Sequence, residues 1–226
     1  MMVNDEVKYS HIFFELNRAS ENSMLINSML RCLCFDYKGL CAHKMSLEQF
    51  SAENKDILLN VKSKEDLDLF LNSINESEKK EAKKHLIIAI ESFDIVLRVS
   101  NESSMENSYL WEGFALYNRA RCKYILNVLY PDSDDWEEDM DAAIRIRGEY
   151  ADRYRAIKSF PAIISHNLLA EYFHAKLERQ FYIAAHKPSK FNKEEFEKLK
   201  QEITKWKNKS LFHIDVLSVA DKLKKI

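Results

Sequence analysis

The scarcity of glycine and proline limits what this chain can fold into. Its 226 residues contain three glycines and three prolines, where average usage of about 7% and about 5% would supply several-fold more. Glycine is the residue that permits positive φ angles and close backbone approach to a phosphate. The composition therefore excludes a glycine-rich phosphate loop, a dinucleotide-binding fingerprint and a β sandwich with many turns.

Apolar residues recur at helical spacing along almost the whole chain. Leu67, Phe70, Leu71 and Ile74, for example, follow the pattern i, i+3, i+4, i+7 of one helix face. No run of alternating apolar and polar residues indicates a β-strand. The sequence therefore predicts an all-α protein, an antiparallel array or bundle of about eight or nine helices. The predicted helices span residues 5–36, 46–60, 63–74, 78–100, 105–129, 134–157, 161–186, 192–208 and 210–224.

The predicted helices group into three segments. Residues 1–76 are rich in Asn, Ser, Leu and Met, with an irregular centre expected around Gly39. Residues 77–186 contain the helices that are densest in aromatic residues, and residues 187–226 are rich in Lys. We expect the first segment to flank or cap a core formed by the second, and the third to pack on that core, in one compact unit.

Charge is balanced over the chain and uneven along it. Lys and Arg total 34 against 36 Asp and Glu, a formal net charge of -2. Lys dominates residues 187–226, but this basic segment contains no Arg and alternates with Glu, so nucleic acid is not an expected partner. No apolar stretch approaches roughly 18 residues, and the first residues lack the pattern of a signal peptide. We therefore expect a cytoplasmic protein that does not enter a membrane.

Three segments between residues 105 and 186 share a pattern of aromatic, small and apolar residues. They are Tyr117-Asn118-Arg119-Ala120 with Tyr124, Trp136 with Ala142-Ala143-Ile144, and Asn167-Leu168-Leu169-Ala170-Glu171-Tyr172. These segments resemble the helices of the tetratricopeptide (TPR) repeat, in which an aromatic-Asn-x-small motif is followed by an aromatic residue one turn later. The resemblance implies a stack of helical hairpins with a concave face that binds a peptide or partner protein. It implies no catalysis and no cofactor.

Polar side chains interrupt the apolar rows of three successive predicted helices. They are Asn118, Arg121, Arg147, Asn167 and His174. A buried amide or charge is costly unless it has a partner, so two interpretations stay open. These residues either fasten the core, with the arginines pairing with Glu112, Glu149 or Glu171, or they line a groove that holds a carboxylate, phosphate or peptide backbone of a partner. The five residues are our candidate binding residues.

One Cys/His cluster raises the question of a metal site. Cys32, Cys34, Cys41 and His43 are four soft ligands within 12 residues, enough for tetrahedral zinc. However, a spacing of two residues within a helix points the first two thiols to opposite sides. Leucine and phenylalanine residues also alternate with these cysteines, as in a core where Cys acts as a small apolar residue. We therefore expect no bound metal.

Three further patterns bear on metal binding or catalysis. The acidic run at 132–141 lacks the central glycine of a calcium loop and suits a helix N-terminus instead. Glu171-x-x-His174 matches half of a di-iron site, and no second such motif is present. Arg179 and His186 match the loose R-x4–6-H pattern and so resemble HEPN-type ribonucleases, although this spacing is also expected by chance.

The sequence as a whole predicts a protein that works by binding. Its expected partner is a protein or peptide, or a second copy of the chain, held on a TPR-like groove. The alternative is an all-helical HEPN-like ribonuclease or toxin that uses Arg179 and His186.

Overall fold

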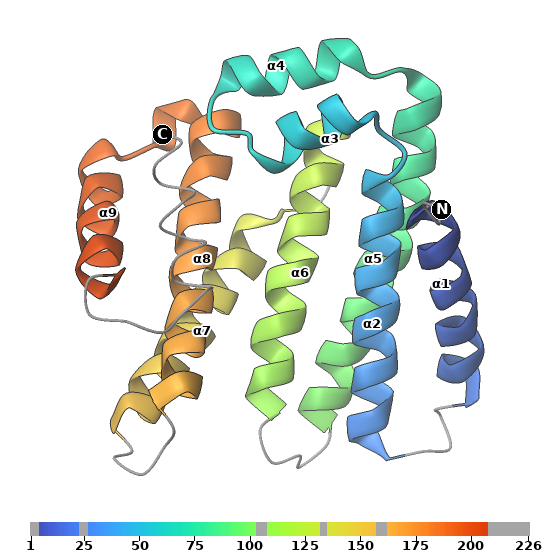
Figure 1. Ribbon diagram of the computed structural model, residues 1–226, viewed down its shortest axis with the longest axis horizontal. Coiled ribbons are helices and arrows are strands. Elements are labelled where there is room, and N and C mark those ends of the chain that lie inside the picture. Colours follow the sequence, from blue (N-terminus) through green and yellow to red (C-terminus); the bar gives the residue numbers. More distant parts are fainter. Residues whose placement is uncertain (1–4, 23–26, 103–107, 132–134, 157–161, 208–226) are drawn as a thin grey trace.

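The computed structural model describes residues 5–22, 27–102, 108–131, 135–156 and 162–207 (Figure 1). All regular structure within these ranges is helical, so the all-α prediction is confirmed. The helices are α1 (Asp5–Asn22), α2 (Ser28–Leu47), α3 (Ala52–Leu59), α4 (Lys64–Ser73), α5 (Glu76–Glu102), α6 (Ser108–Leu129), α7 (Glu137–Ala156), α8 (Ala162–His186) and α9 (Lys193–Lys207), with a 3₁₀ turn at Pro188–Lys190.

The long helices form an antiparallel array in two layers. The long helices pack in chain order: α1 packs on α2, α2 on α5, α5 on α6, α6 on α7 and α7 on α8. Helices α2, α6 and α8 lie in the front layer of Figure 1, with α5 and α7 behind them. The short helices α3 and α4 cross one end of the array, where α4 contacts α8.

Two clusters of buried apolar side chains hold the array together. The larger one runs from Cys32 of α2 to Ala185 of α8 and includes residues of every helix from α2 to α8. The smaller one joins α8 to α9, whose Phe196, Leu199 and Ile203 are buried against it. Within the described residues, no helix is both long and apolar enough to cross a membrane.

The N-terminal helix boundaries differ from the prediction. The single helix expected over 5–36 is two helices, because α2 starts anew after Asn27, whose side chain accepts a hydrogen bond from the Leu30 amide at 3.2 Å. The irregular centre expected around Gly39 is also wrong, since Gly39 lies within α2. A Cβ at this position would lie 2.7 Å from Cζ of Phe93 on α5, so glycine serves here to bring two helices close together.

Capping residues define the short helices that follow. The helix predicted over 46–60 is divided between the end of α2 and α3, which starts after the N-cap Ser51. Ser63 and Asp66 form a capping box at the start of α4, with each side chain accepting a hydrogen bond from the other residue's amide. The helix predicted over 210–224 lies outside the described residues.

Candidate functional site

A buried carboxylate that the sequence did not reveal lies at the centre of a polar cluster between α6 and α8. Glu178 of α8 is 7% exposed. The Tyr117 hydroxyl donates a hydrogen bond of 2.6 Å to its Oε2 atom, and Arg121 Nε lies 3.5 Å from the same oxygen. His174, one turn earlier on α8, places Nε2 3.9 Å from Oε1. Two predicted residues, Arg121 and His174, thus meet around a carboxylate.

The electrostatics of this cluster favour a fixed arrangement. Burial, and then the charge of Glu178, raise the pKa of Tyr117 well above its ordinary value, so its hydroxyl stays protonated and donates. Burial lowers the pKa of Arg121, but Glu178, Tyr117 and Tyr182 together raise it by more, so the pKa is raised overall and the guanidinium stays charged. One turn after Glu178 on α8, the ring of Tyr182 stacks on that of Tyr124 of α6, with centroids 3.6 Å apart. The ion pair is therefore supported by a rigid aromatic contact between the same two helices.

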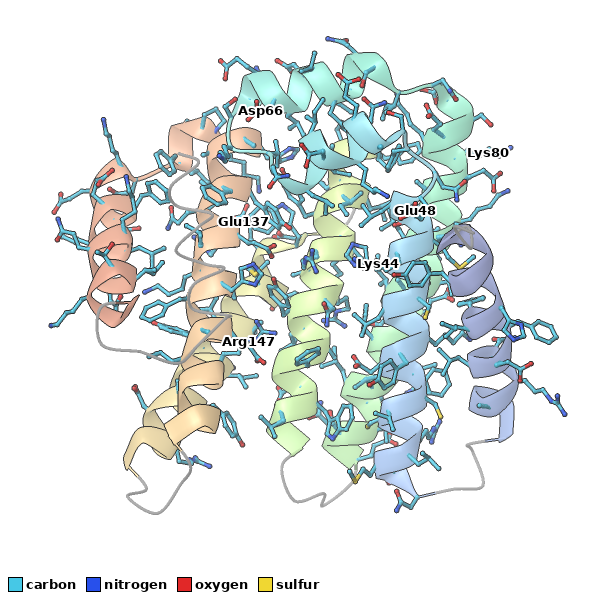
Figure 2. The ribbon with its side chains drawn as sticks, in the orientation of Figure 1. Lys44, Glu48, Asp66, Lys80, Glu137 and Arg147 are labelled. Carbon is cyan, nitrogen blue, oxygen red and sulfur yellow. The ribbon has the colours of Figure 1, made fainter. Side chains whose placement is uncertain are left out.

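Arg147 of α7 enters the same region, where its described contacts are with two aromatic rings and a backbone carbonyl. It is 6% exposed, and Figure 2 shows it in the space between α6 and α8. Its guanidinium carbon lies 4.0 Å from the centroid of the Tyr117 ring and 5.6 Å from that of Phe114. Nη1 donates to the backbone carbonyl of Glu171 at 3.1 Å, and in the part of the chain that the structure describes no carboxylate oxygen lies within 4.0 Å of it. Burial accordingly lowers the pKa of Arg147.

The two predicted asparagines do not join this group in the same way. Asn118 is 3% exposed and donates from Nδ2 to the carbonyl of Phe114 on its own helix at 3.1 Å. Asn167 belongs to α8, but its side chain lies outside the part that the structure describes. The structure therefore brings Arg121 and His174 to Glu178 and places Arg147 against the Tyr117 ring beside them. Glu178 takes the place of the three glutamates considered as ion-pair partners of Arg121.

The cysteines and the histidine that were considered as zinc ligands all lie on α2. Burial raises the pKa of Cys32 to about 11, and its thiol lies 3.9 Å from the carbonyl oxygen of Val96 on α5. Burial also lowers the pKa of His43 to about 3, so this ring is neutral. Among the described residues, no three His, Cys, Asp or Glu side chains are placed to hold a metal ion.

The acidic start of α7 has a structural role. Asp139 is 5% exposed and accepts two hydrogen bonds from Arg119, at 2.7 Å from Nε and 2.6 Å from Nη2. Lys123 lies 3.1 Å from the same carboxylate, and Arg119 also binds Asp94 of α5. These charges join three neighbouring helices, so their role is to align α5, α6 and α7.

The residues of the ribonuclease alternative are held apart. Arg179 donates from Nη2 to Oδ2 of Asp141 on α7 at 3.0 Å, and from Nε to the other carboxylate oxygen. His186 lies two turns further along α8, roughly 10 Å by helical rise. Its ring centroid is 6.3 Å from that of Tyr124, and burial lowers its pKa. The guanidinium is thus occupied by a carboxylate of a neighbouring helix.

A second buried carboxylate, Asp36 of α2, has no hydrogen-bond partner for its Oδ1 atom among the described residues. It is 6% exposed, and burial raises its pKa to about 6. The pKa of an unfolded Asp is about 3.9. Ionisation is therefore harder in the folded state, and this group's contribution to stability is lost as the pH rises through about 6.

Replacing Asp36 by Asn is expected to raise the free energy of unfolding at pH 7 by about 2 kcal/mol, because it removes a buried charge and keeps the shape. At pH 4 Asp36 is protonated in the folded state and about half protonated in the unfolded state, so the gain should fall to less than about 1 kcal/mol. Urea unfolding of the two proteins at both pH values measures the difference. Asp68→Asn, on the exposed surface of α4, is the control. An equal gain at pH 4 and pH 7 would contradict this electrostatic account.

A small pocket adjoins the polar cluster where the α3–α4 connection meets α8. Its lining residues are Leu59, Asn60, Val61, Lys62, Glu178, Phe181 and Tyr182. The connection thus closes the upper end of the cluster, while at the start of α6 Leu110 and Phe114 are 40% and 39% exposed. The open end of the site is therefore apolar and its interior is charged.

Comparison with family models, with curated proteins and with solved structures finds no match for this chain.

Proposed function

We propose that the protein is a non-enzymatic scaffold, and that a partner protein binds at the open end of the α6–α8 site. One observation carries this proposal: Arg147 is buried beside the exposed ring of Phe114, and none of the described carboxylates lies in ion-pair range of it. Arginine and aromatic side chains are enriched where partner proteins bind most strongly. The arrangement of the helices as antiparallel hairpins also supports the TPR-like interpretation.

The chemistry of the polar cluster also favours binding over catalysis. A general acid or base is most effective when its pKa lies near the working pH. Here the pKa of Tyr117 is raised well above its ordinary value, and Glu178 is occupied by Tyr117 and Arg121. These groups hold each other in place, and such a fixed arrangement suits a binding surface that is formed before the partner arrives.

Affinity purification from native cells tests the proposal with a matched pair of variants. Phe114→Glu replaces the exposed ring beside Arg147 with a carboxylate. Leu69→Glu introduces the same charge at a 58% exposed position on α4. We expect the unchanged protein and Leu69→Glu to recover the same partner, and Phe114→Glu to lose it by at least about tenfold, the effect of about 1.4 kcal/mol. Equal recovery by the two variants would reject this site.

The scaffold proposal also predicts that the purified protein leaves a mixed RNA pool intact. His186→Ala is then expected to change nothing in a gel-based cleavage assay, because Arg179 is engaged by Asp141. RNA cleavage that disappears in His186→Ala would replace the scaffold with the ribonuclease alternative. Cleavage that survives the substitution would indicate a contaminating nuclease.

A further inference from the structure

One edge of the Arg147 guanidinium has no partner among the described residues. Of its three nitrogens, Nη1 alone donates to another described residue, the backbone carbonyl of Glu171, at 3.1 Å. Nε is buried and has no hydrogen-bond partner among these residues. Because the side chain is buried, water satisfies this edge poorly. A buried polar group without a partner is costly, so the edge formed by Nε and Nη2 is where a ligand would gain most.

Two other arginines of this chain show what the same edge binds. Arg119 donates from Nε and Nη2 to the two carboxylate oxygens of Asp139. Arg179 uses the same two nitrogens on the carboxylate of Asp141. The N–H groups of this edge are parallel, and their spacing matches that of the two oxygens of a carboxylate. The chemistry that fits the corresponding edge of Arg147 is therefore that of a carboxylate.

The charges around Arg147 favour an anion with a single negative charge. Arg121 and Glu178 form an ion pair, so their charges offset one another. Burial, and to a smaller extent the charge of Arg121, lower the pKa of Arg147, whereas the more distant carboxylate of Glu171 raises it. One further carboxylate would supply the counter-charge of Arg147. A phosphoryl group carries about −2 and would leave a negative charge in excess.

The aromatic rings around the guanidinium leave one route to it. Its central carbon lies 4.0 Å from the centroid of the Tyr117 ring, and the Tyr117 hydroxyl is held by Glu178. The Phe114 ring, on the other hand, is 39% exposed, as is Leu110 one turn earlier at 40%. An exposed side chain changes rotamer readily, so Phe114 is the side chain that can admit a ligand. A ligand that enters there passes two apolar side chains and gains from an apolar group beside its carboxylate.

We propose that the Nε–Nη2 edge of Arg147 binds the carboxylate of an acidic side chain of the partner protein, and that an apolar residue next to it packs on Phe114 and Leu110. This inference rests on the proposed scaffold function and names the group that the partner inserts. The contact is a bidentate, charge-assisted hydrogen bond in a region shielded from water, where such bonds are strong. A side-chain amide in the same place would offer one acceptor to two donors, so the site distinguishes Glu from Gln.

A small carboxylate tests the inference on the full chain. The probe is phenylacetate, which joins one carboxylate to one aromatic ring, and the matched control is the neutral phenylacetamide. Binding is followed in NMR spectra by the backbone amide signals of α6 and by the Nε–H signal of Arg147, which Arg147→Met identifies by its absence. We expect saturable shifts with a Kd on the order of 1 mM for a ligand of this size. Phenylacetamide should bind at least tenfold more weakly.

Two pairs of variants separate the carboxylate contact from a general loss of structure. Arg147→Met should weaken phenylacetate binding at least tenfold, and Arg145→Met, at a 63% exposed side chain of the same helix, should leave it unchanged. The second pair keeps Arg147 in place. Phe114→Glu should bind phenylacetate at least tenfold more weakly than Phe114→Gln, because its own carboxylate then occupies the edge.

Four results would overturn the inference. Equal binding of phenylacetate and phenylacetamide would mean that the ring alone is recognised, and tighter binding of phenyl phosphate would assign the edge to a phosphoryl group. Equal losses in Arg145→Met and Arg147→Met, or equal binding by the two Phe114 variants, would place the carboxylate elsewhere. Partner recovery from cells tests the proposed function separately. A partner recovered by a protein that does not bind phenylacetate would keep the scaffold and reject this contact, and phenylacetate binding without a recovered partner would do the reverse.

Discussion

Arg121→Ala is expected to lower the free energy of unfolding by about 3 kcal/mol, because it leaves the carboxylate of Glu178 buried without its counter-ion. Breaking a buried ion pair by removing one partner costs about 3–5 kcal/mol. The lower end applies here, since the Arg121 side chain is 24% exposed and lies 3.5 Å from the carboxylate. Urea unfolding at pH 7 measures the loss. For a chain of this length it corresponds to a fall of about 10 °C in Tm.

Two further variants show whether the stranded charge is the cause. Adding Glu178→Gln to Arg121→Ala should restore part of the lost stability, because the double variant has no buried charge at this position. Arg147→Met should cost less than about 1 kcal/mol, since it strands no carboxylate and an apolar side chain of similar length replaces a buried charge. An Arg121→Ala protein as stable as the original would show instead that Arg121 is a groove residue whose removal the fold tolerates.

Gly39→Val is expected to destabilise the protein by about 3 kcal/mol through overpacking. An added Cβ would lie 2.7 Å from Cζ and 2.8 Å from Cε1 of Phe93, which is fully buried and has no room to move. Valine is a better helix former than glycine by about half a kcal/mol, so helix propensity offsets only a small part of the steric cost. Thermal melts of the purified variant measure the change.

A second glycine provides the matched control for this clash. At Gly113 on α6 the nearest atom to an added Cβ is Cγ2 of Ile146, 3.1 Å away and at the end of a side chain. Gly113→Val should therefore cost less than Gly39→Val. Adding Phe93→Leu to Gly39→Val should recover stability by making room at the helix crossing. No recovery in that double variant would mean that the loss arises within α2 itself.

The spacing of apolar residues predicted most of the helices. Where this prediction failed, the cause is a contact between residues far apart in the sequence. The periodicity of apolar residues predicts each of α4 to α9 to within three residues at either end. At Gly39 the sequence suggested irregular structure, since glycine in a helix is unfavourable by about 1 kcal/mol. The compensating contact is with Phe93, more than fifty residues away, and nothing local to Gly39 indicates it.

The same reasoning separates the site residues that were found from the one that was missed. Arg121 and Arg147 could be identified because each interrupts an apolar row on its own helix. Glu178 is followed by Arg179 and Gln180, and nothing in this polar run distinguishes it from a surface residue. Its position one turn after His174 on the same helix was the one local indication that Glu178 belongs to the site. Its burial depends on Tyr117 and Arg121 of α6, which sequence spacing alone does not place opposite α8.

The crossing of α3 and α4 has a mechanical consequence for the array. In an open helical solenoid each unit contacts only its neighbours, so the whole can lengthen and twist freely. Here the connection that leaves α2 spans one end of the array, and α4 packs on α8, with the three long helices α5, α6 and α7 between them in the chain. Widening the array at that end requires α4 to detach from α8 first. A displacement of α8 therefore strains the connection that leads back through α4 and α3 to α2.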